Sequence, residues 1–244
     1  MANVYRELRP PSGLDHLACG WVSDGAAGSV LPDACVDVVL EEGRLVVAGP
    51  ATAAVDVAAT PGQHRCGVRF RVGAAGAALG LPADELRDLT VPLEDVWGPT
   101  GRRLSLRVAG ASSPEAALAV LVRGFAEPRS SLDPLARRAA LLSSRRPFGE
   151  VSRELGFSER QLRRRVEQAV GYGPRTLLRI LRLQRFLQRV EREPATTLAR
   201  LAADTGYADQ AHLTRECRSL TGRTAATLRA AGATAAGERM SETF

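Results

Sequence analysis

Two stretches of the chain resemble each other, and this repeat restricts the fold more than any other feature of the sequence. In both, an apolar segment ends at a glycine followed by an aromatic residue, Gly156-Phe157 in the first copy and Gly206-Tyr207 in the second. Glycine adopts the left-handed backbone that ends many helices without strain. Each copy therefore predicts a helix, a tight turn and a second helix, which is the layout of a helix-turn-helix unit.

The residues after each turn fit the start of a second helix. Ser158 is expected to cap the helix of the first copy and to form a capping box with Gln161, and Asp209 is the expected cap of the second copy. Apolar residues four positions apart face inward together. These inward pairs are Leu162 with Val166, and Leu213 with Cys217.

The outward faces of the two second helices carry arginine and glutamine, whose side chains read guanine and adenine edges in the DNA major groove. One copy alone favours an amphipathic hairpin with a solvated charged face, because a lone helix-turn-helix pattern is a weak signal. Two copies favour DNA binding. The outward residues are Arg160, Arg163 and Arg164 in the first copy, and Gln210, Ala211, Thr214 and Arg215 in the second.

The segment between the copies, 174–192, is expected to be one amphipathic helix of about 28 Å, at about 1.5 Å per residue. Successive major grooves on one face of DNA lie about 34 Å apart, so this helix can set two recognition helices into adjacent grooves. Arg179 and Arg185 on it are expected to contact phosphates.

The net charge is divided unevenly along the chain. All 33 basic residues are arginine, and the whole chain carries a formal charge of +6. Residues 1–132 have 12 arginines and 15 acids, a net charge of −3, whereas residues 133–244 have 21 arginines and 12 acids, a net charge of +9. The excess positive charge lies in the half with the repeat, as expected for a half that binds a polyanion.

The first half alternates short apolar segments with Gly- and Pro-containing turns, which predicts a small β-barrel or sandwich. Glu42-Gly43 is expected to form a tight hairpin turn. Trp21, Phe70 and Trp97 are either core residues or the lining of a ligand pocket. Arg69 and Arg71 are expected on one strand face, where they bind a carboxylate ligand or pair with acidic side chains.

Four cysteines, Cys19, Cys35, Cys66 and Cys217, form no CxxC pair and are expected to be buried, reduced thiols. A metal site built from His64, Cys66 and either Cys35 or Cys19 is the alternative, but no second close pair completes it. We therefore expect neither a metal nor another cofactor. No apolar segment reaches the length of a membrane span, and the amino terminus does not resemble a secretion signal.

The stretch from about 135 to 229 resembles the DNA-binding domain of AraC/XylS-type transcription regulators, which has two helix-turn-helix units joined by a long helix. The best match is 206–216, with further matches at 171–174 and at Arg182-Leu183. Cys217 and Ala225 depart from the family, which usually has Phe and Pro there. The resemblance implies DNA contacts at the outward residues named above and at His212, and we add Gln161 to this expected set.

Segments 31–37, 48–52, 67–73 and 81–86 resemble the amino-terminal, cupin-like domain of a subset of these regulators. We therefore expect an α+β chain with a sensor or dimerisation domain at 1–110, a linker helix region at 111–132, a double helix-turn-helix domain at 133–231 and a loose tail at 232–244.

The expected function is that of a cytoplasmic bacterial transcription regulator that binds double-stranded DNA and is not an enzyme. RNA polymerase and a small-molecule effector are further candidate partners, and both monomer and homodimer stay open. The two alternatives are a cupin-like metal-dependent enzyme and a DNA-binding architectural protein without sequence preference.

Overall fold

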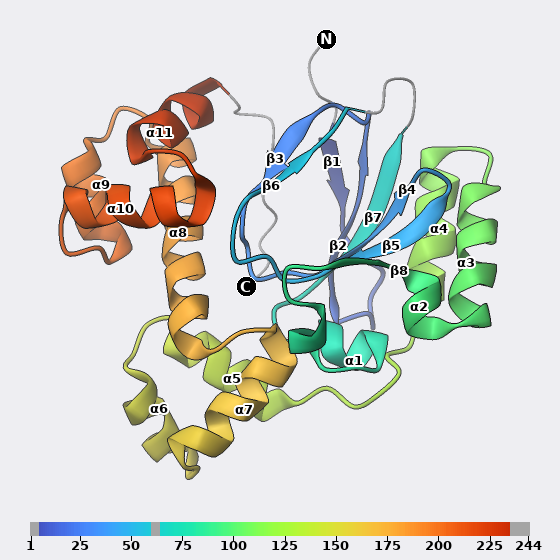
Figure 1. The fold of residues 1–244 in the computed structure, drawn as a ribbon, viewed down its shortest axis with the longest axis horizontal. Coiled ribbons are helices and arrows are strands. Elements are labelled where there is room, and N and C mark those ends of the chain that lie inside the picture. Colours follow the sequence, from blue (N-terminus) through green and yellow to red (C-terminus); the bar gives the residue numbers. More distant parts are fainter. Residues whose placement is uncertain (1–4, 60–63, 235–244) are drawn as a thin grey trace.

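The computed structural model of the protein describes residues 5–59 and 64–234 and has a sheet-rich amino-terminal part and an all-helical carboxy-terminal part (Figure 1). This is the α+β organisation expected from the sequence. Six strands form one sheet in the order β1-β2-β7-β4-β5-β8, and β3 pairs with β6. The strands are β1 (Tyr5–Leu8), β2 (Leu17–Ser23), β3 (Gly28–Val30), β4 (Asp37–Glu41), β5 (Arg44–Ala48), β6 (Val55–Val57), β7 (Arg65–Phe70) and β8 (Thr90–Pro92).

The expected hairpin turn joins β4 to β5. Glu42 and Gly43 both have positive φ, +47° and +78°, which is the backbone of a two-residue hairpin turn that matches the twist of the strands. The turn sets the antiparallel register in which Val38 lies opposite Val47. Both valine side chains are fully buried, so the hairpin supplies part of the sheet core.

Short helices follow the sheet strands and cover part of the sheet (Figure 1). They are α1 (Ala75–Leu79), the single 3-10 turn η1 (Ala83–Leu86), α2 (Leu93–Trp97), α3 (Pro99–Ala109) and α4 (Pro114–Gly124). Ser113 caps α4 through its side chain, as the sequence predicts. Leu118, Leu121 and Phe125 pack into the core of the sheet, so the expected linker region 111–132 contributes a helix to the amino-terminal domain.

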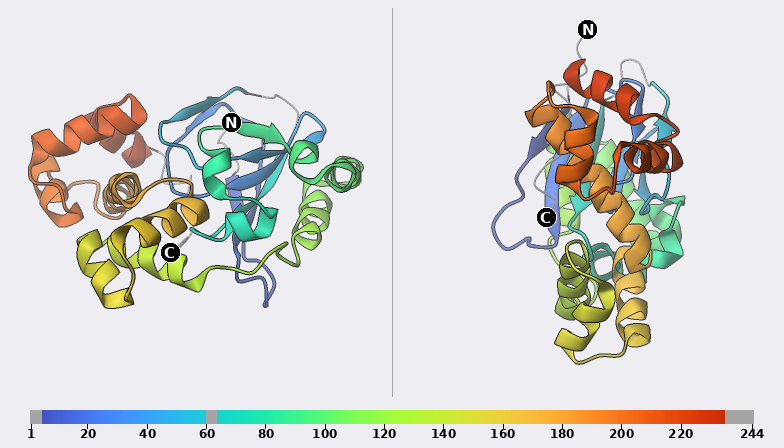
Figure 2. Two further views of the ribbon diagram at one scale, coloured as in Figure 1. Left: turned by 60° about the horizontal axis from the view of Figure 1, so that its bottom comes forward. Right: turned by 90° about the vertical axis from the view of Figure 1, so that its left-hand side faces the viewer.

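The carboxy-terminal part contains seven helices among the described residues: α5 (Pro134–Ser143), α6 (Phe148–Leu155), α7 (Glu159–Val170), α8 (Pro174–Arg192), α9 (Leu198–Thr205), α10 (Gln210–Thr221) and α11 (Ala225–Thr234). In Figure 2 the long helix α8 carries α5–α7 at one end and α9–α11 at the other. Of the tail expected from residue 232, positions 235–244 lie outside the described residues.

The two parts share an interface that includes backbone and side-chain contacts. Ala34 and Cys35, in the loop between β3 and β4, are buried in the core of the helical part. The side-chain amide of Gln184 on α8 donates a hydrogen bond to the carbonyl oxygen of Pro32 in the same loop. Arg87 Nε donates to the carbonyl oxygen of Gly171, directly after α7. The amino-terminal part therefore touches the helices that carry the repeat.

Candidate nucleic-acid interface

The first helix-turn-helix unit consists of α6 and α7 and has the local structure expected from its sequence. Gly156 ends α6 with φ of +73°. The Ser158 hydroxyl accepts a hydrogen bond from the Gln161 backbone amide at 3.3 Å, and Gln161 Oε1 accepts one from the Ser158 amide at 3.2 Å. This capping box satisfies backbone donors at the start of α7. Leu162 and Val166 are fully buried, which fixes the opposite face of α7 towards solvent.

The second unit, α9 and α10, repeats this construction. Gly206 ends α9 with φ of +86°, and Asp209 Oδ1 accepts a hydrogen bond from the His212 backbone amide at 2.6 Å. Tyr207 is buried and belongs to the core of the helical part. Leu213 and Cys217 are fully buried, as expected from their spacing.

The predicted DNA-contacting residues of α7 are exposed. Arg160, Arg163 and Arg164 form no ion pair among the described residues, so their guanidinium groups are available to an incoming anion. Gln161 is also exposed, but its side-chain oxygen accepts the capping bond, which leaves its amino group as the available donor.

The predicted DNA-contacting residues of α10 differ in exposure and in hydrogen bonding. Gln210, Ala211 and Arg215 are exposed. His212 is half-buried, its ring lies edge-on against Tyr207 at 5.4 Å between centroids, and the Ala208 amide contacts its Nδ1 at 3.3 Å. The Thr214 hydroxyl donates to the carbonyl oxygen of Gln210 at 2.9 Å. Three residues therefore project from α10, and two lie closer to its backbone.

The long helix α8 joins the units and packs against both. Arg179 was expected to contact phosphate, but its Nε lies 2.8 Å from Glu216 Oε2 and its NH2 group donates to the Ser219 hydroxyl at 2.8 Å. Both partners are on α10. Arg179 therefore fixes α10 to α8, and a contact with phosphate would have to replace a hydrogen-bonded ion pair.

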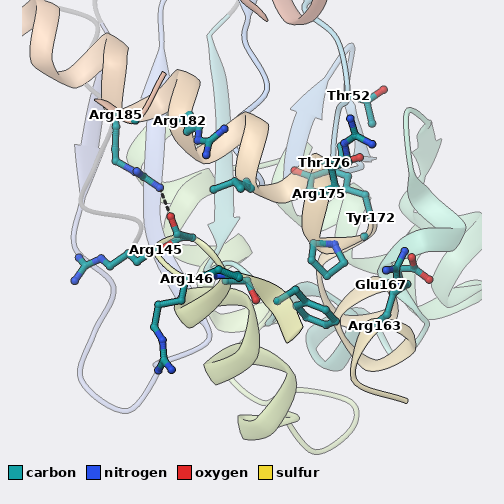
Figure 3. A pocket seen from close by; sticks show the side chains of 18 of the residues that line it. Thr52, Arg145, Arg146, Arg163, Glu167, Tyr172, Arg175, Thr176, Arg182 and Arg185 are labelled. Carbon is teal, nitrogen blue, oxygen red and sulfur yellow. Dashed lines mark hydrogen bonds between the residues drawn. The ribbon is translucent and has the colours of Figure 1, made fainter. Parts of the chain in front are cut away.

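A cleft of about 910 Å³ lies between α7, α8, the α5–α6 turn and the edge of the amino-terminal part (Figure 3). Arg163 of the predicted recognition helix lines it, as do Arg145 and Arg182. Arg185 reaches across from α8 and donates a hydrogen bond to the carbonyl oxygen of Ser144 at 2.6 Å. Burial, together with the charges of Arg182 and Arg145, lowers the pKa of Arg185. The cleft thus concentrates positive charge next to α7.

This cleft was not predicted from the sequence. The signal that was available is the spacing of Arg175, Arg182 and Arg185, seven and three positions apart, which places them on one face of a helix. The contribution of Arg145 depends on how the α5–α6 turn packs against α8, and the local sequence does not specify that.

The five residues expected to bind an effector do not meet in one place. Phe70 and Trp97 both pack against Phe125, with ring centroids 5.3 and 4.7 Å apart. Trp21 instead lies next to Tyr5, with ring centroids 5.8 Å apart. Since Trp21 is paired with Gly67 and Phe70 lies three positions after Gly67, the two aromatic rings are on opposite faces of the sheet.

Arg69 is engaged with acidic side chains of the protein itself. Its Nε and NH2 groups donate to the two carboxylate oxygens of Asp37, each at 3.0 Å, and its NH1 group lies 3.3 Å from Asp33. Arg71 lies one residue past the end of β7 and is half-buried. Of the two alternatives predicted for Arg69, binding a carboxylate ligand or pairing with acidic side chains of the protein, the structure shows the second.

The cysteines are buried thiols, as expected. Burial raises the pKa of Cys66 to about 11, and burial together with Glu216 raises the pKa of Cys217 to about 12. His64 is exposed, and within 5–59 and 64–234 no group of three or more His, Cys, Asp or Glu side chains is arranged to hold a metal ion. No helix in the described part is long and apolar enough to span a membrane.

Comparison with known protein families identifies two segments. Residues 151–231 match the family described as a helix-turn-helix domain, and residues 6–92 match a family described as a domain of unknown function (DUF6597). A search of curated proteins found no match.

Among solved structures, the chain is similar to ToxT from Vibrio cholerae, with 9% identity and a TM-score of 0.44 over 93% of this chain and 97% of that chain. It is also similar to apo ToxT K231A from Vibrio cholerae strain SCE256, with 10% identity and a TM-score of 0.42 over 93% of this chain and 96% of that one.

Proposed function

Because residues 151–231 form an AraC-type helix-turn-helix domain in a DNA-binding transcription regulator, we propose that the protein recognises a specific DNA sequence with α7 and α10 in successive major grooves. The observation that carries this proposal is the pair of units at the two ends of α8. A helix of 19 residues spans about 28 Å, close to the roughly 34 Å between successive major grooves on one face of DNA.

The exposed side chains of the two helices supply the chemistry. Arginine donates two hydrogen bonds to guanine, and glutamine pairs with adenine in the same way. We assign the guanine contacts to Arg164 and Arg215 and an adenine contact to Gln210. Arg160, Arg163, Ala211, Thr214, the amino group of Gln161 and the edge of His212 complete the proposed surface.

The amino-terminal part is proposed to control this binding, either by taking up an effector or by forming a dimer. Its support is the set of contacts made by Pro32, Arg87 and the loop that follows β5 with the helical part. A change in the sheet domain would reach both helix-turn-helix units through these contacts. Since bacterial DNA lies in the cytoplasm, the proposal places the protein there, where RNA polymerase is a further candidate partner.

The test is selection of binding sites by the full-length protein from a pool of random duplexes, followed by titration of the selected duplex and a scrambled one at moderate salt. We expect the selected duplex to bind at least about a thousandfold more tightly, which is the low end for specific regulators. Equal binding of both duplexes would instead favour an architectural protein and would contradict the proposal.

A further inference from the structure

The cleft beside α7 has a regular wall on α8. Arg175, Leu178, Arg182 and Arg185 all line it, and their spacing of three, four and three residues places them along one face of the helix. From Arg175 to Arg185 this face extends about 15 Å at about 1.5 Å per residue. We call these three arginines, together with Arg145 across the cleft, the cleft arginines.

The cleft arginines have little compensating negative charge. Among the residues that the structure describes, Arg145, Arg175 and Arg182 form no ion pair. Among the described residues that line the cleft, Glu167 is the one acidic side chain. The neighbouring Arg146 forms ion pairs with Glu150 and Glu154 and is not counted among the cleft arginines. Burial and the adjacent guanidinium groups of Arg182 and Arg145 disfavour the charge on Arg185, as the lowered pKa indicates. An anion in the cleft would relieve this repulsion.

The position of the cleft indicates that the anion it binds is the DNA backbone. One end opens at Arg163, on the proposed recognition face of the first unit. The other end reaches Gly206, at the turn of the second unit, where the Arg182 and Arg185 side chains approach the glycine. The cleft is thus continuous with both units. Each DNA strand carries one phosphate charge per about 3.4 Å of helix axis, so a row of arginines about 15 Å long can face more than one phosphate of a strand.

We propose that the cleft arginines are a phosphate-binding site that holds the DNA backbone where it passes from the first major groove to the second. This inference rests on the proposed function and adds a sequence-independent part to it. Thr52 and Arg87 of the amino-terminal part also line the cleft, so the sheet domain borders the path of the DNA.

The experiment measures binding of the full-length protein to a mixed-sequence duplex of about 30 base pairs, long enough for both grooves, at salt concentrations from about 50 to 200 mM. The variants are Arg182→Gln, Arg145→Gln and the double variant. Arg192→Gln is the matched control, because Arg192 is an exposed arginine of the same helix outside the cleft. Equal melting temperatures establish that all variants are folded.

Each single cleft variant should weaken binding about five- to tenfold at low salt. The slope of log affinity against log salt should fall by about one in each single variant and by about two in the double variant. The control should change affinity less than twofold. The same losses should appear on the duplex selected for specific binding. If the cleft variants behave like Arg192→Gln, the inference is wrong.

Titration with inorganic tripolyphosphate tests whether the site serves a small phosphorylated ligand instead. Saturable binding of one tripolyphosphate that Arg182→Gln abolishes, with unchanged duplex affinity, would overturn the DNA assignment. The expected result is weak competition that matches the added ionic strength. Failure of the proposed function is a separate outcome, because it would appear as absence of sequence preference in the wild type, while the salt slope on mixed-sequence DNA still reports on the cleft.

Discussion

The backbone amide of Ala54 donates a hydrogen bond to the carbonyl oxygen of Leu220, 2.9 Å away, and so joins the amino-terminal part to the end of α10. The same loop contacts the end of α7, where Pro50 packs against Gly171. One loop of the sheet domain therefore touches the carboxy-terminal ends of both proposed recognition helices. Through this loop the sheet domain can restrain the relative orientation of α7 and α10.

The packing of Pro50 on Gly171 can be measured with two glycines that hold equivalent places in the repeat. Gly171 and Gly222 end α7 and α10 with φ of +97° and +69°. A Cβ on Gly222 would meet no atom within 4 Å, whereas one on Gly171 would lie 2.2 Å from Pro50 Cγ. Gly222→Ala should lower the free energy of unfolding by about 1 kcal/mol through backbone strain alone, and Gly171→Ala by about 3 kcal/mol through strain and overpacking.

A double-mutant cycle with Pro50→Ala isolates the contact. Removing Pro50 Cγ should restore part of the loss in Gly171→Ala but none of the loss in Gly222→Ala, as followed by urea unfolding. Equal losses in the two glycine variants would show that the domains separate easily at this loop.

The ion pair of Arg69 with Asp37 and Asp33 should be a major determinant of stability. The three side chains are only 12%, 13% and 16% exposed. Arg69→Met leaves two nearly buried carboxylates without a cation, so we expect the free energy of unfolding to fall by about 3–5 kcal/mol. Arg44→Met, on the exposed end of β5, is the control and should change it by less than about 0.5 kcal/mol. Similar values for the two variants would refute a structural role for the Arg69 network.

Local features of the helical part could be predicted from the sequence because the responsible residues are close along the chain. Gly156, Gly206, Ser158 and Asp209 each act within about one turn of a helix, and each has the predicted role in the structure. The buried pairs on α7 and α10 follow from helical spacing in the same way.

Features that depend on distant residues could not be predicted in this way. Arg179 was expected to contact phosphate, but its partner Glu216 lies 37 positions away on a helix whose packing the local sequence does not specify. The separation of Phe70 from Arg69 is a different case, because neighbours on a strand necessarily point to opposite faces. The strand alternation of β7 therefore predicts from the sequence alone that Arg69 and Phe70 point to opposite faces of the sheet.

Arg179 should affect stability more than DNA binding. Its hydrogen-bonded ion pair with Glu216 is partly buried, with side-chain exposures of 32% and 18%. We expect Arg179→Ala to lower the free energy of unfolding by about 1–2 kcal/mol, because charged hydrogen bonds of this kind contribute more than exposed pairs. In a double-mutant cycle, Arg179→Ala should lower the free energy of unfolding less in the Glu216→Gln background than in the wild type. A normal stability with DNA affinity reduced on every sequence would return Arg179 to a phosphate-binding role.

The thiols should be inert in the folded protein. The raised pKa of Cys66, about 11, and of Cys217, about 12, leaves almost no thiolate near neutral pH, and thiolate is the reactive form. We expect iodoacetamide to label these cysteines slowly in native protein and all four rapidly in guanidinium chloride, as counted by mass spectrometry. Rapid labelling of one cysteine in the native state would point to an activated thiol and reopen an enzymatic role.

The final prediction separates base reading from charge on α7 and α10. Arg164 and Arg215 are exposed and form no ion pair in the described part of the chain, so each can contact a base edge without breaking an internal contact. Arg164→Ala and Arg215→Ala should each cost about 1–3 kcal/mol of binding to the selected duplex and relax the preference at one base pair. Arg218→Ala, at an exposed arginine in the last turn of α10, removes the same charge and should leave the order of sequence preferences unchanged. Titration of duplexes that each carry one changed base pair distinguishes the two effects, because a phosphate contact weakens binding to every duplex equally. If Arg164→Ala and Arg215→Ala also produce only a uniform loss, base recognition must be assigned to other residues of α7 and α10.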